Sequence, residues 1–311
     1  MTENQWLKLH AQSLEWVKAQ LNPTAKVLDV YSLKGGTSST LLELLVQEED
    51  QQRFYVLRLF HKADWLAKEP DLAKHEAESL QYAKRAGLAV PRLIAYDETG
   101  ENSGMPAVLM TKMPGSVVLQ PSNDEQWLDS LAATLAKLHQ TKVDNFSYDY
   151  FSYNDVFLLE KPIWSKFQHD WMRAFYIVSG GRPSFQECFI HRDFHPANIL
   201  WEDRQVSAIV DWVNACRGPA GIDIGHCRVN LAQLYGISVA NDFLTAYERH
   251  AGSSFTYDPY WDLLSLTDTL DGSPTVYPGW KVFGMKGLSD ELMRHRLDDY
   301  LLSLLDRFDD F

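Results

Sequence analysis

Residues 191–212 carry polar side chains at fixed intervals between strand-like runs, and this segment constrains the fold most. Asp193 is followed five positions later by Asn198, and then by an apolar run. A second apolar run, Ile209–Val210, ends at Asp211. Loops favour Asp, Asn and Pro in any protein. Here, however, the spacing predicts that two carboxylates and one carboxamide meet at a single site between the runs.

Two carboxylates and a carboxamide at this spacing suit phosphoryl transfer from a magnesium nucleotide. That reaction needs an acceptor hydroxyl held in line and metal ions on the phosphates. Asp193 would orient the hydroxyl or receive its proton, while Asn198 and Asp211 would hold Mg²⁺ through oxygen atoms. An alternative takes His191, Asp193 and His195 as ligands of a transition metal, because imidazole suits zinc and iron. That alternative leaves Asn198 and Asp211 unexplained.

These residues, followed by the run Gly218–Gly225, resemble the aminoglycoside phosphotransferase and choline kinase-like family. Its members are small-molecule kinases with a protein-kinase-like fold. The resemblance covers nearly the whole chain and is strongest over residues 189–226. It implies the roles given above for Asp193, Asn198 and Asp211. It also implies that His191 and Asp223 support the catalytic loop, with His191 tying the loop to the Asp211 segment.

Protein kinases share part of this pattern but differ in the segment after Asp211. The chain reads Asp-Trp-Val at 211–213 where protein kinases have Asp-Phe-Gly, and no Ala-Pro-Glu follows. Only eleven residues separate Asp211 from Asp223. An activation segment that docks a peptide needs more chain than that. We therefore expect the acceptor to be a small molecule with a hydroxyl group.

The front third of the chain predicts a nucleotide site. Residues 26–33, 40–46 and 53–60 are strand candidates, and a glycine turn joins the first two. Glycine lets backbone amides approach phosphates, and neighbouring hydroxyls add donors. The same turn would also suit an ordinary hairpin. The predicted contacts in this turn are Gly35, Gly36, Thr37, Ser38 and Ser39.

Arg58 lies on the third of these strands, and a helix carrying Glu76 follows. In the family that the chain resembles, a basic residue at this position contacts the nucleotide phosphates and pairs with a helix glutamate. Protein kinases use lysine there, but a planar guanidinium also suits phosphate oxygens. The alternative is an exposed strand arginine paired with a neighbouring carboxylate.

Residues 106–110 form another apolar strand, and the following residues 111–115 resemble the hinge between kinase lobes. The adenine ring would bind to the backbone near Lys112 and Met113. Met110 would border the adenine pocket, although methionine there is equally compatible with core packing.

Helical spacing of apolar residues appears at 72–86, 123–140, 222–235, 240–250, 258–270 and 289–308. Strands in front and helices behind predict a bilobal α+β protein-kinase-like fold. The small β-rich N-terminal lobe would cover residues 1–113, with the hinge near 111–115. The larger, mostly helical C-terminal lobe would cover residues 114–311 and hold the catalytic and acceptor sites.

The composition limits the cellular setting and the partners. The 311 residues carry a net charge of −13, and with no basic stripe this argues against nucleic-acid binding. The sequence contains neither a secretory signal nor an apolar run of about 18 residues, so we expect no membrane partner. Three cysteines without a Cys-x-x-Cys pair suggest reduced thiols in a cytoplasmic protein. We expect a monomer or a homodimer.

The expected acceptor is a cation. Residues from 114 onward contain 27 acidic and 16 basic side chains, which accounts for −11 of the net charge. Such a lobe would attract an aminoglycoside, a macrolide or an amino alcohol, although acidic surfaces also promote solubility. Carboxylates and aromatic rings can hold an ammonium group. The candidates for this role are Tyr257, Trp261, Asp262 and Asp268.

The resemblance implies Mg²⁺ and ATP as cofactors and leaves GTP open as the donor. It also leaves open a metabolic kinase for homoserine, thiamine or methylthioribose. A catalytically idle nucleotide-binding module is a further alternative, suggested by Arg58 and by the unorthodox glycine turn.

Overall fold

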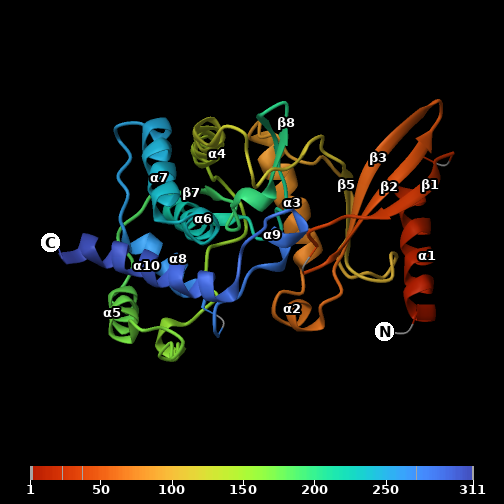
Figure 1. The fold of residues 1–311 in the computed structure, drawn as a ribbon. Helices are drawn as coiled ribbons and strands as arrows, with labels where there is room; N and C mark the ends of the chain where they lie inside the picture. The colour runs from red at the N-terminus through yellow and green to blue at the C-terminus, as the bar shows by residue number, and fades with distance from the viewer. Residues whose placement is uncertain (1–2, 23, 37, 271, 310–311) are drawn as a thin grey trace. The chain divides into compact units, whose positions relative to one another are not determined.

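The computed structural model describes residues 3–22, 24–36, 38–270 and 272–309 (Figure 1). The chain divides into two units, which we call the strand unit (residues 1–115 and 207–214) and the helical unit (residues 116–206 and 215–311). The expected division at residues 113 and 114 lies close to the first boundary. No sequence pattern predicted that residues 207–214, which include Asp211, would belong to the strand unit.

A five-stranded antiparallel sheet with the order β1-β2-β3-β5-β4 forms the strand unit. Its strands are β1 (Lys26–Ser32), β2 (Thr40–Glu48), β3 (Gln51–Leu59), β4 (Leu93–Asp97) and β5 (Ala107–Thr111). All four expected strands are confirmed, and β4 is an addition. The register places Arg58 of β3 opposite Leu41 of β2 and Val108 of β5.

Side chains of β3 alternate between two sides of the sheet, as strand geometry requires. Leu57 and Leu59 are buried in a core with Trp16 and Val17 of helix α1 (Glu3–Gln20). Arg58, between the two leucines, therefore faces the opposite side and is 2% exposed. The other helices of this unit are α2 (Ala63–Lys68) and α3 (Leu72–Arg85).

Helices dominate the helical unit, as predicted. They are α4 (Asp124–His139), α5 (Gln168–Ser179), α6 (Ala220–Tyr235), α7 (Ile237–Ala251), α8 (Tyr260–Asp268), α9 (Pro278–Val282) and α10 (Asp290–Asp309), with short 3-10 turns η1 (Val156–Leu158) and η2 (Pro196–Asn198). Helix α4 shows the physical basis of such a helix. Asn123 caps it by accepting the backbone N–H of Gln126 at 3.2 Å. Its leucines, buried at helical spacing, face the interior of the unit.

Short strands flank residues 191–198. They are β6 (Ser116–Val117), β7 (Glu187–Ile190), β8 (Ile199–Glu202), β9 (Gln205–Ile209) and β10 (Cys216–Pro219). Ile190 pairs with Cys216, so residue 191 leaves β7 close to the point where β10 begins. Helix α6 starts directly after β10, and Asp223 in its first turn accepts backbone hydrogen bonds from the loop that follows β7.

Two glycines of α6 allow close packing against α8. A Cβ on Gly221 would lie 2.2 Å from the ring of Trp261, and one on Gly225 would lie 2.5 Å from the Trp261 carbonyl oxygen. Any side chain at either position would separate the two helices. Among the described residues, no helix has both the length and the apolar character needed to cross a membrane.

Candidate active site

Asp223 supports the catalytic loop from the first turn of α6. Its carboxylate accepts the backbone N–H of His191 at 2.8 Å and the backbone N–H of Arg192 at 2.6 Å. The Asp223 side chain is fully buried, and His139 Nε2 lies 3.1 Å from one of its oxygens. The predicted brace is therefore present. The predicted tie between His191 and the Asp211 segment would join the two units, and it stays a prediction.

Arg192 turns the chain immediately before Asp193. Its φ of 67° is in the left-handed region, which a side chain of this size seldom adopts without compensating contacts. The guanidinium lies 4.0 Å from the Phe151 ring centroid and 3.8 Å from that of Tyr153. It also donates to the Phe151 carbonyl oxygen at 2.6 Å. These contacts hold the turn that places Asp193.

The Asp193 carboxylate is held at both oxygens. Oδ1 lies 3.1 Å from His226 Nε2 and 3.7 Å from His195 Nε2, while Oδ2 accepts from Asn198 Nδ2 at 3.1 Å. Burial opposes ionisation, but the His226 hydrogen bond and the nearby imidazoles hold the pKa of Asp193 well below its usual range. The side chain remains 31% exposed. It is therefore an ionised and accessible acceptor for a hydroxyl proton.

Asn198 has the orientation that a cation ligand requires. Its amide nitrogen donates to the Asp193 carbonyl oxygen at 2.9 Å as well as to the carboxylate. These bonds use the nitrogen and leave the amide oxygen, the atom that would bind Mg²⁺, outside them.

Asp211, the other expected metal ligand, lies in the strand unit, 30% exposed at its side chain and with a φ of 66°. One of its oxygens, Oδ1, accepts a hydrogen bond from Arg58 Nη1. A magnesium ion commonly takes one or two protein oxygens and completes its shell with phosphate and water. Asp211 and Asn198 fit such a site in their chemistry, and their convergence stays a proposal.

Within the described residues, no group of three or more His, Cys, Asp or Glu side chains is arranged to hold a metal ion. The alternative of a transition metal on His191, Asp193 and His195 therefore gains no support from the geometry.

Arg58 forms the predicted ion pair with Glu76 at 2.9 Å, and it also pairs with Asp211 at 2.6 Å. Its Nε donates to Ser39 Oγ at 2.8 Å. Burial alone lowers the pKa of this guanidinium, but the two carboxylates hold it above the usual value. Burial, together with the Asp211 charge, raises the pKa of Glu76 against the opposing effect of Arg58. The alternative of an exposed strand arginine is wrong, because Arg58 is buried.

The residues of the glycine turn that were expected to contact phosphate differ in exposure, and not all of them are accessible. Gly35 has a φ of 100°, and a Cβ on Gly36 would lie 2.6 Å from the Ser39 carbonyl oxygen. The turn thus requires glycine at both positions. Ser38 is half-buried, whereas Ser39 is 3% exposed and supports Arg58. Thr37 lies outside the described residues.

The hinge segment follows β5 as expected, but the backbone of Lys112 is already engaged. Its N–H donates to the Phe54 carbonyl oxygen at 3.2 Å, and its ammonium pairs with Glu43 at 2.8 Å. A base would therefore meet the backbone of the next residue, Met113, rather than the Lys112 amide. Met110 lies on β5, between β3 and the edge strand β4, and is 5% exposed, which agrees with a role in the core.

Three of the four acceptor candidates belong to the interior of the helical unit. Asp262 is fully buried and pairs with Arg228, and it accepts from Tyr257 Oη at 2.9 Å and Tyr300 Oη at 3.0 Å. Trp261 is 4% exposed because it packs on Gly221. The sequence-based assignment of Tyr257, Trp261 and Asp262 to the acceptor therefore gives way to a structural role. A buried arginine needs a buried carboxylate, and the aromatic residues enclose that pair.

Asp268, at the end of α8, has a different environment. Its Oδ2 accepts from Tyr150 Oη at 3.4 Å, while its Oδ1 is buried without a hydrogen-bond partner in the described structure. Burial raises the pKa of Asp268 to about 6, and Arg192 and His226 are among the groups that oppose this rise. Asp268 thus lies within electrostatic range of a residue that contacts Asp193.

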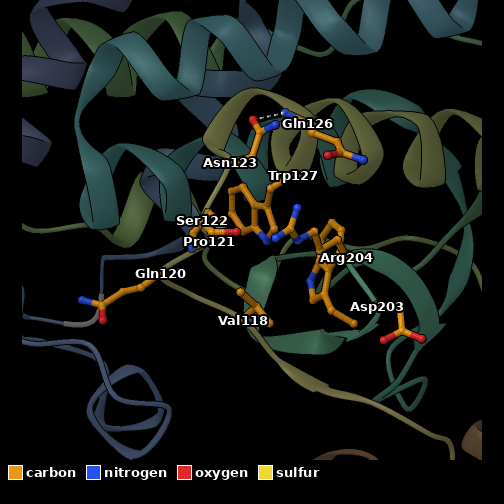
Figure 2. Close-up of a pocket in the computed structure, with 10 residues that line it drawn as sticks. Val118, Gln120, Pro121, Ser122, Asn123, Gln126, Trp127, Asp203 and Arg204 are labelled. Carbon is orange, nitrogen blue, oxygen red and sulfur yellow. Dashed lines mark hydrogen bonds between the residues drawn. The ribbon is translucent and has the colours of Figure 1, made fainter.

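The helical unit also contains a pocket of about 330 Å³ that the sequence did not indicate (Figure 2). Trp127 and Trp201 stack there, with ring centroids 5.9 Å apart and planes at 24°. Figure 2 shows Asn123 and its hydrogen bond to Gln126 at the start of α4. None of the predicted site residues lines this pocket, whose lining is Val118, Gln120, Pro121, Ser122, Asn123, Gln126, Trp127, Trp201, Asp203 and Arg204.

Sequence reasoning missed His226 at the site. This residue lies outside the recognised loop, three positions after Asp223 on α6. The available signal was its helical spacing. A side chain one turn after Asp223 shares the face that Asp223 turns toward the catalytic loop.

Comparison with protein families gives a match of residues 33–262 to the model of the phosphotransferase enzyme family. A search of curated proteins finds no match to this chain.

Solved structures with the same fold have low sequence identity to the chain. A candidate aminoglycoside phosphotransferase from Ralstonia eutropha JMP134 has a TM-score of 0.66 at 15% identity, covering 95% of this chain and 98% of that one. Choline kinase LicA from Streptococcus pneumoniae has a TM-score of 0.60 at 12% identity, covering 94% and 99%. A thermostable variant of aminoglycoside phosphotransferase APH(4)-Ia, in a ternary complex with AMP-PNP and hygromycin B, has a TM-score of 0.58 at 15% identity, covering 93% and 97%. The bilobal protein-kinase-like fold is thereby confirmed.

Proposed function

Because this chain belongs to the phosphotransferase enzyme family, we propose that it transfers the γ-phosphate of ATP to a hydroxyl group of a small molecule, with Mg²⁺ as the metal ion. The family gives the class of reaction, which is small-molecule phosphoryl transfer. We propose the identity of the phosphate donor, of the metal ion and of the acceptor. The observation that supports it most is the ionised Asp193 carboxylate, held by His226 and Asn198 on a loop that Asp223 braces.

Residues of the strand unit would bind the nucleotide. Arg58 would direct its permanent charge to the phosphates, with Glu76 holding its side chain. The amides of Gly35 and Gly36 and the hydroxyl of Ser38 would contact phosphate oxygens. We propose the same contact for the hydroxyl of Thr37. The Met113 backbone would bind the base. A structure of similar fold is a complex with AMP-PNP, which supports a nucleotide site in this architecture.

Asn198 and Asp211 would hold Mg²⁺, which would neutralise charge on the phosphates when bound. Asp193 would align the acceptor hydroxyl with the γ-phosphorus and receive its proton. The acceptor oxygen forms a bond to that phosphorus while the bond to the bridging oxygen breaks, so that ADP leaves and the proton passes from Asp193 to solvent. A carboxylate of low pKa suffices here, since phosphoryl transfer proceeds with little proton movement until late.

We propose a cationic acceptor, with Asp268 as its partner. The carboxylate has one oxygen without a hydrogen-bond partner in the described structure, and it lies within electrostatic range of His226. Exposed Phe151 and Tyr153 flank Arg192 in the same unit, and their rings can cover a sugar or an ammonium group. The acidic balance of residues 114–311 favours the approach of a cation.

Radiolabelled ATP with Mg²⁺ and a panel of acceptors tests the proposal. The panel holds aminoglycosides, macrolides and choline, together with homoserine, thiamine and methylthioribose as metabolic alternatives. We expect label on one of the cations and a loss of at least about a hundredfold in Asp193→Asn. Asp203→Asn, at an exposed turn residue, is the matched control. ATP binding without transfer to any acceptor would instead favour an idle nucleotide-binding module.

A further inference from the structure

A histidine outside the recognised loop contacts the catalytic carboxylate. His226 lies on α6, and its Nε2 is 3.1 Å from Asp193 Oδ1. Because an ionised carboxylate can only accept, Nε2 must carry a proton in this contact. Asn198 holds the other carboxylate oxygen at 3.1 Å. The two contacts together fix the rotation of the carboxylate, which a single hydrogen bond would leave free.

The His226 ring is itself placed by helix α6. Asn230, one turn later, donates from Nδ2 to the His226 carbonyl oxygen at 2.9 Å. The same nitrogen lies 3.2 Å from His226 Nε2, but the two do not hydrogen-bond while Nε2 carries the proton that Asp193 accepts, because both are then donors. The ring of His195 packs edge-on against that of His226, with centroids 5.8 Å apart. The His226 side chain is 26% exposed, so it lies at the site surface rather than in the core.

Charged groups surround His226 on each element that faces it. Asp193 lies on the catalytic loop with His191 and His195, and Asp223 precedes His226 on α6. Asp268 faces it from the end of α8, where Arg192 adds a positive charge near the Asp268 carboxylate. Burial acts against the charged ring, but the carboxylates raise the pKa of His226 above its usual value.

We propose that His226 is a positioning residue for the transfer reaction, and that its Nε2–H holds the Asp193 carboxylate in the orientation that receives the acceptor hydroxyl. This inference rests on the proposed function. It adds a residue on α6 to the machinery, and it makes the reaction sensitive to pH. When the imidazolium loses its proton the hydrogen bond remains, but the positive charge that weakens Asp193 as a base is gone. The rate should therefore rise with pH.

Three variants at position 226 test the inference in the full-length enzyme. In His226→Gln the amide nitrogen can replace Nε2–H, whereas His226→Ala and His226→Leu offer no donor. We expect His226→Ala and His226→Leu to lower kcat by about tenfold to a hundredfold, with the acceptor KM within about twofold. His226→Gln should restore most of kcat and flatten the rise of kcat with pH, whose midpoint in the wild type lies above about 6.5.

The pair of His250 and Asp129 provides a matched control. These side chains are 2.8 Å apart in the same unit, on α7 and α4. His250→Ala removes an equivalent pair and should leave kcat and its pH profile unchanged. The inference is overturned if His226→Ala retains wild-type kcat, or if His226→Gln and His226→Ala lose activity equally. Asp193→Asn in the same assay separates the two levels: if that variant keeps full activity, the proposed function fails, whatever the result at position 226.

Discussion

Arg58 Nη1 donates to Asp211 Oδ1 at 2.6 Å, although 153 positions separate the two residues in the chain. The same nitrogen also donates to Glu76 at 2.9 Å. The residue expected to orient phosphates is therefore joined to a residue expected to hold the metal. We expect this group to act as one unit, in which the two carboxylates fix the guanidinium before a nucleotide binds.

Replacing Arg58 alone should lower the free energy of unfolding more than replacing Arg58 and Glu76 together. Arg58→Ala leaves Glu76 buried without its cation, and we expect a loss of about 3–5 kcal/mol in the free energy of unfolding. The double variant Arg58→Ala, Glu76→Ala should be more stable than Arg58→Ala alone, because no buried charge is left unpaired. Urea denaturation of the three proteins measures this. A double variant no more stable than Arg58→Ala alone would contradict the interpretation of a coupled ion pair.

Asp223→Ala should loosen the catalytic loop. Two buried amides, those of His191 and Arg192, would lose their acceptor, at about 1–3 kcal/mol for each unsatisfied group. Hydrogen exchange should become faster at these two amides, and kcat should fall with it. Asp242→Asn, at an exposed carboxylate on α7, serves as the control. Unchanged protection of the two amides in Asp223→Ala would show that the loop does not depend on this brace.

Asp262→Asn distinguishes a structural aspartate from an acceptor contact. Because Asp262 is the buried partner of Arg228, we expect a loss of stability of about 3–5 kcal/mol. The acceptor KM of the protein that remains folded should stay close to that of the wild type. Thermal unfolding and steady-state kinetics at a permissive temperature check both parts. A large increase in the acceptor KM with normal stability would instead indicate that Asp262 contacts the acceptor.

Asp268 should give acceptor binding a pH dependence. With a pKa of about 6, the carboxylate is mostly ionised at pH 7 and mostly neutral at pH 5, while an alkylammonium acceptor stays charged. Affinity is thus present above the pKa and is lost as the pH falls through it. The acceptor KM should rise about tenfold from pH 7 to pH 5. In Asp268→Asn the acceptor KM should be high and nearly independent of pH. A wild-type pH profile in that variant would show that Asp268 does not contact the acceptor.

The fold could be predicted to a large extent from local patterns. Alternating apolar residues identified β2 and β3, and helical spacing identified α3, α4 and α6 because each pattern buries one face of its element. The short strands β4 and β6 were missed. They are too short to show a period, and the pairing partner of β6, strand β8, is distant in the chain.

The site was predictable wherever a residue type and its spacing carry the chemistry. The brace from Asp223 and the pair of Arg58 with Glu76 are both present as expected. The acceptor residues were not predictable, because an aspartate beside aromatic rings has the same sequence pattern in a core as in a binding site. Burial and pairing separate the two cases: Asp262 is fully buried against Arg228, whereas Asp268 is half-buried and its Oδ1 has no hydrogen-bond partner among the described residues.

The sequence indicated the reaction class and the candidate side chains for it, because phosphoryl transfer requires particular oxygen ligands at a set spacing along the chain. The tertiary structure was needed to identify the groups that surround those side chains. The contact of His226 with Asp193 and that of Arg58 with Asp211 each join separate elements. Such contacts depend on how helices and strands pack, and packing sums many weak interactions that no local pattern records.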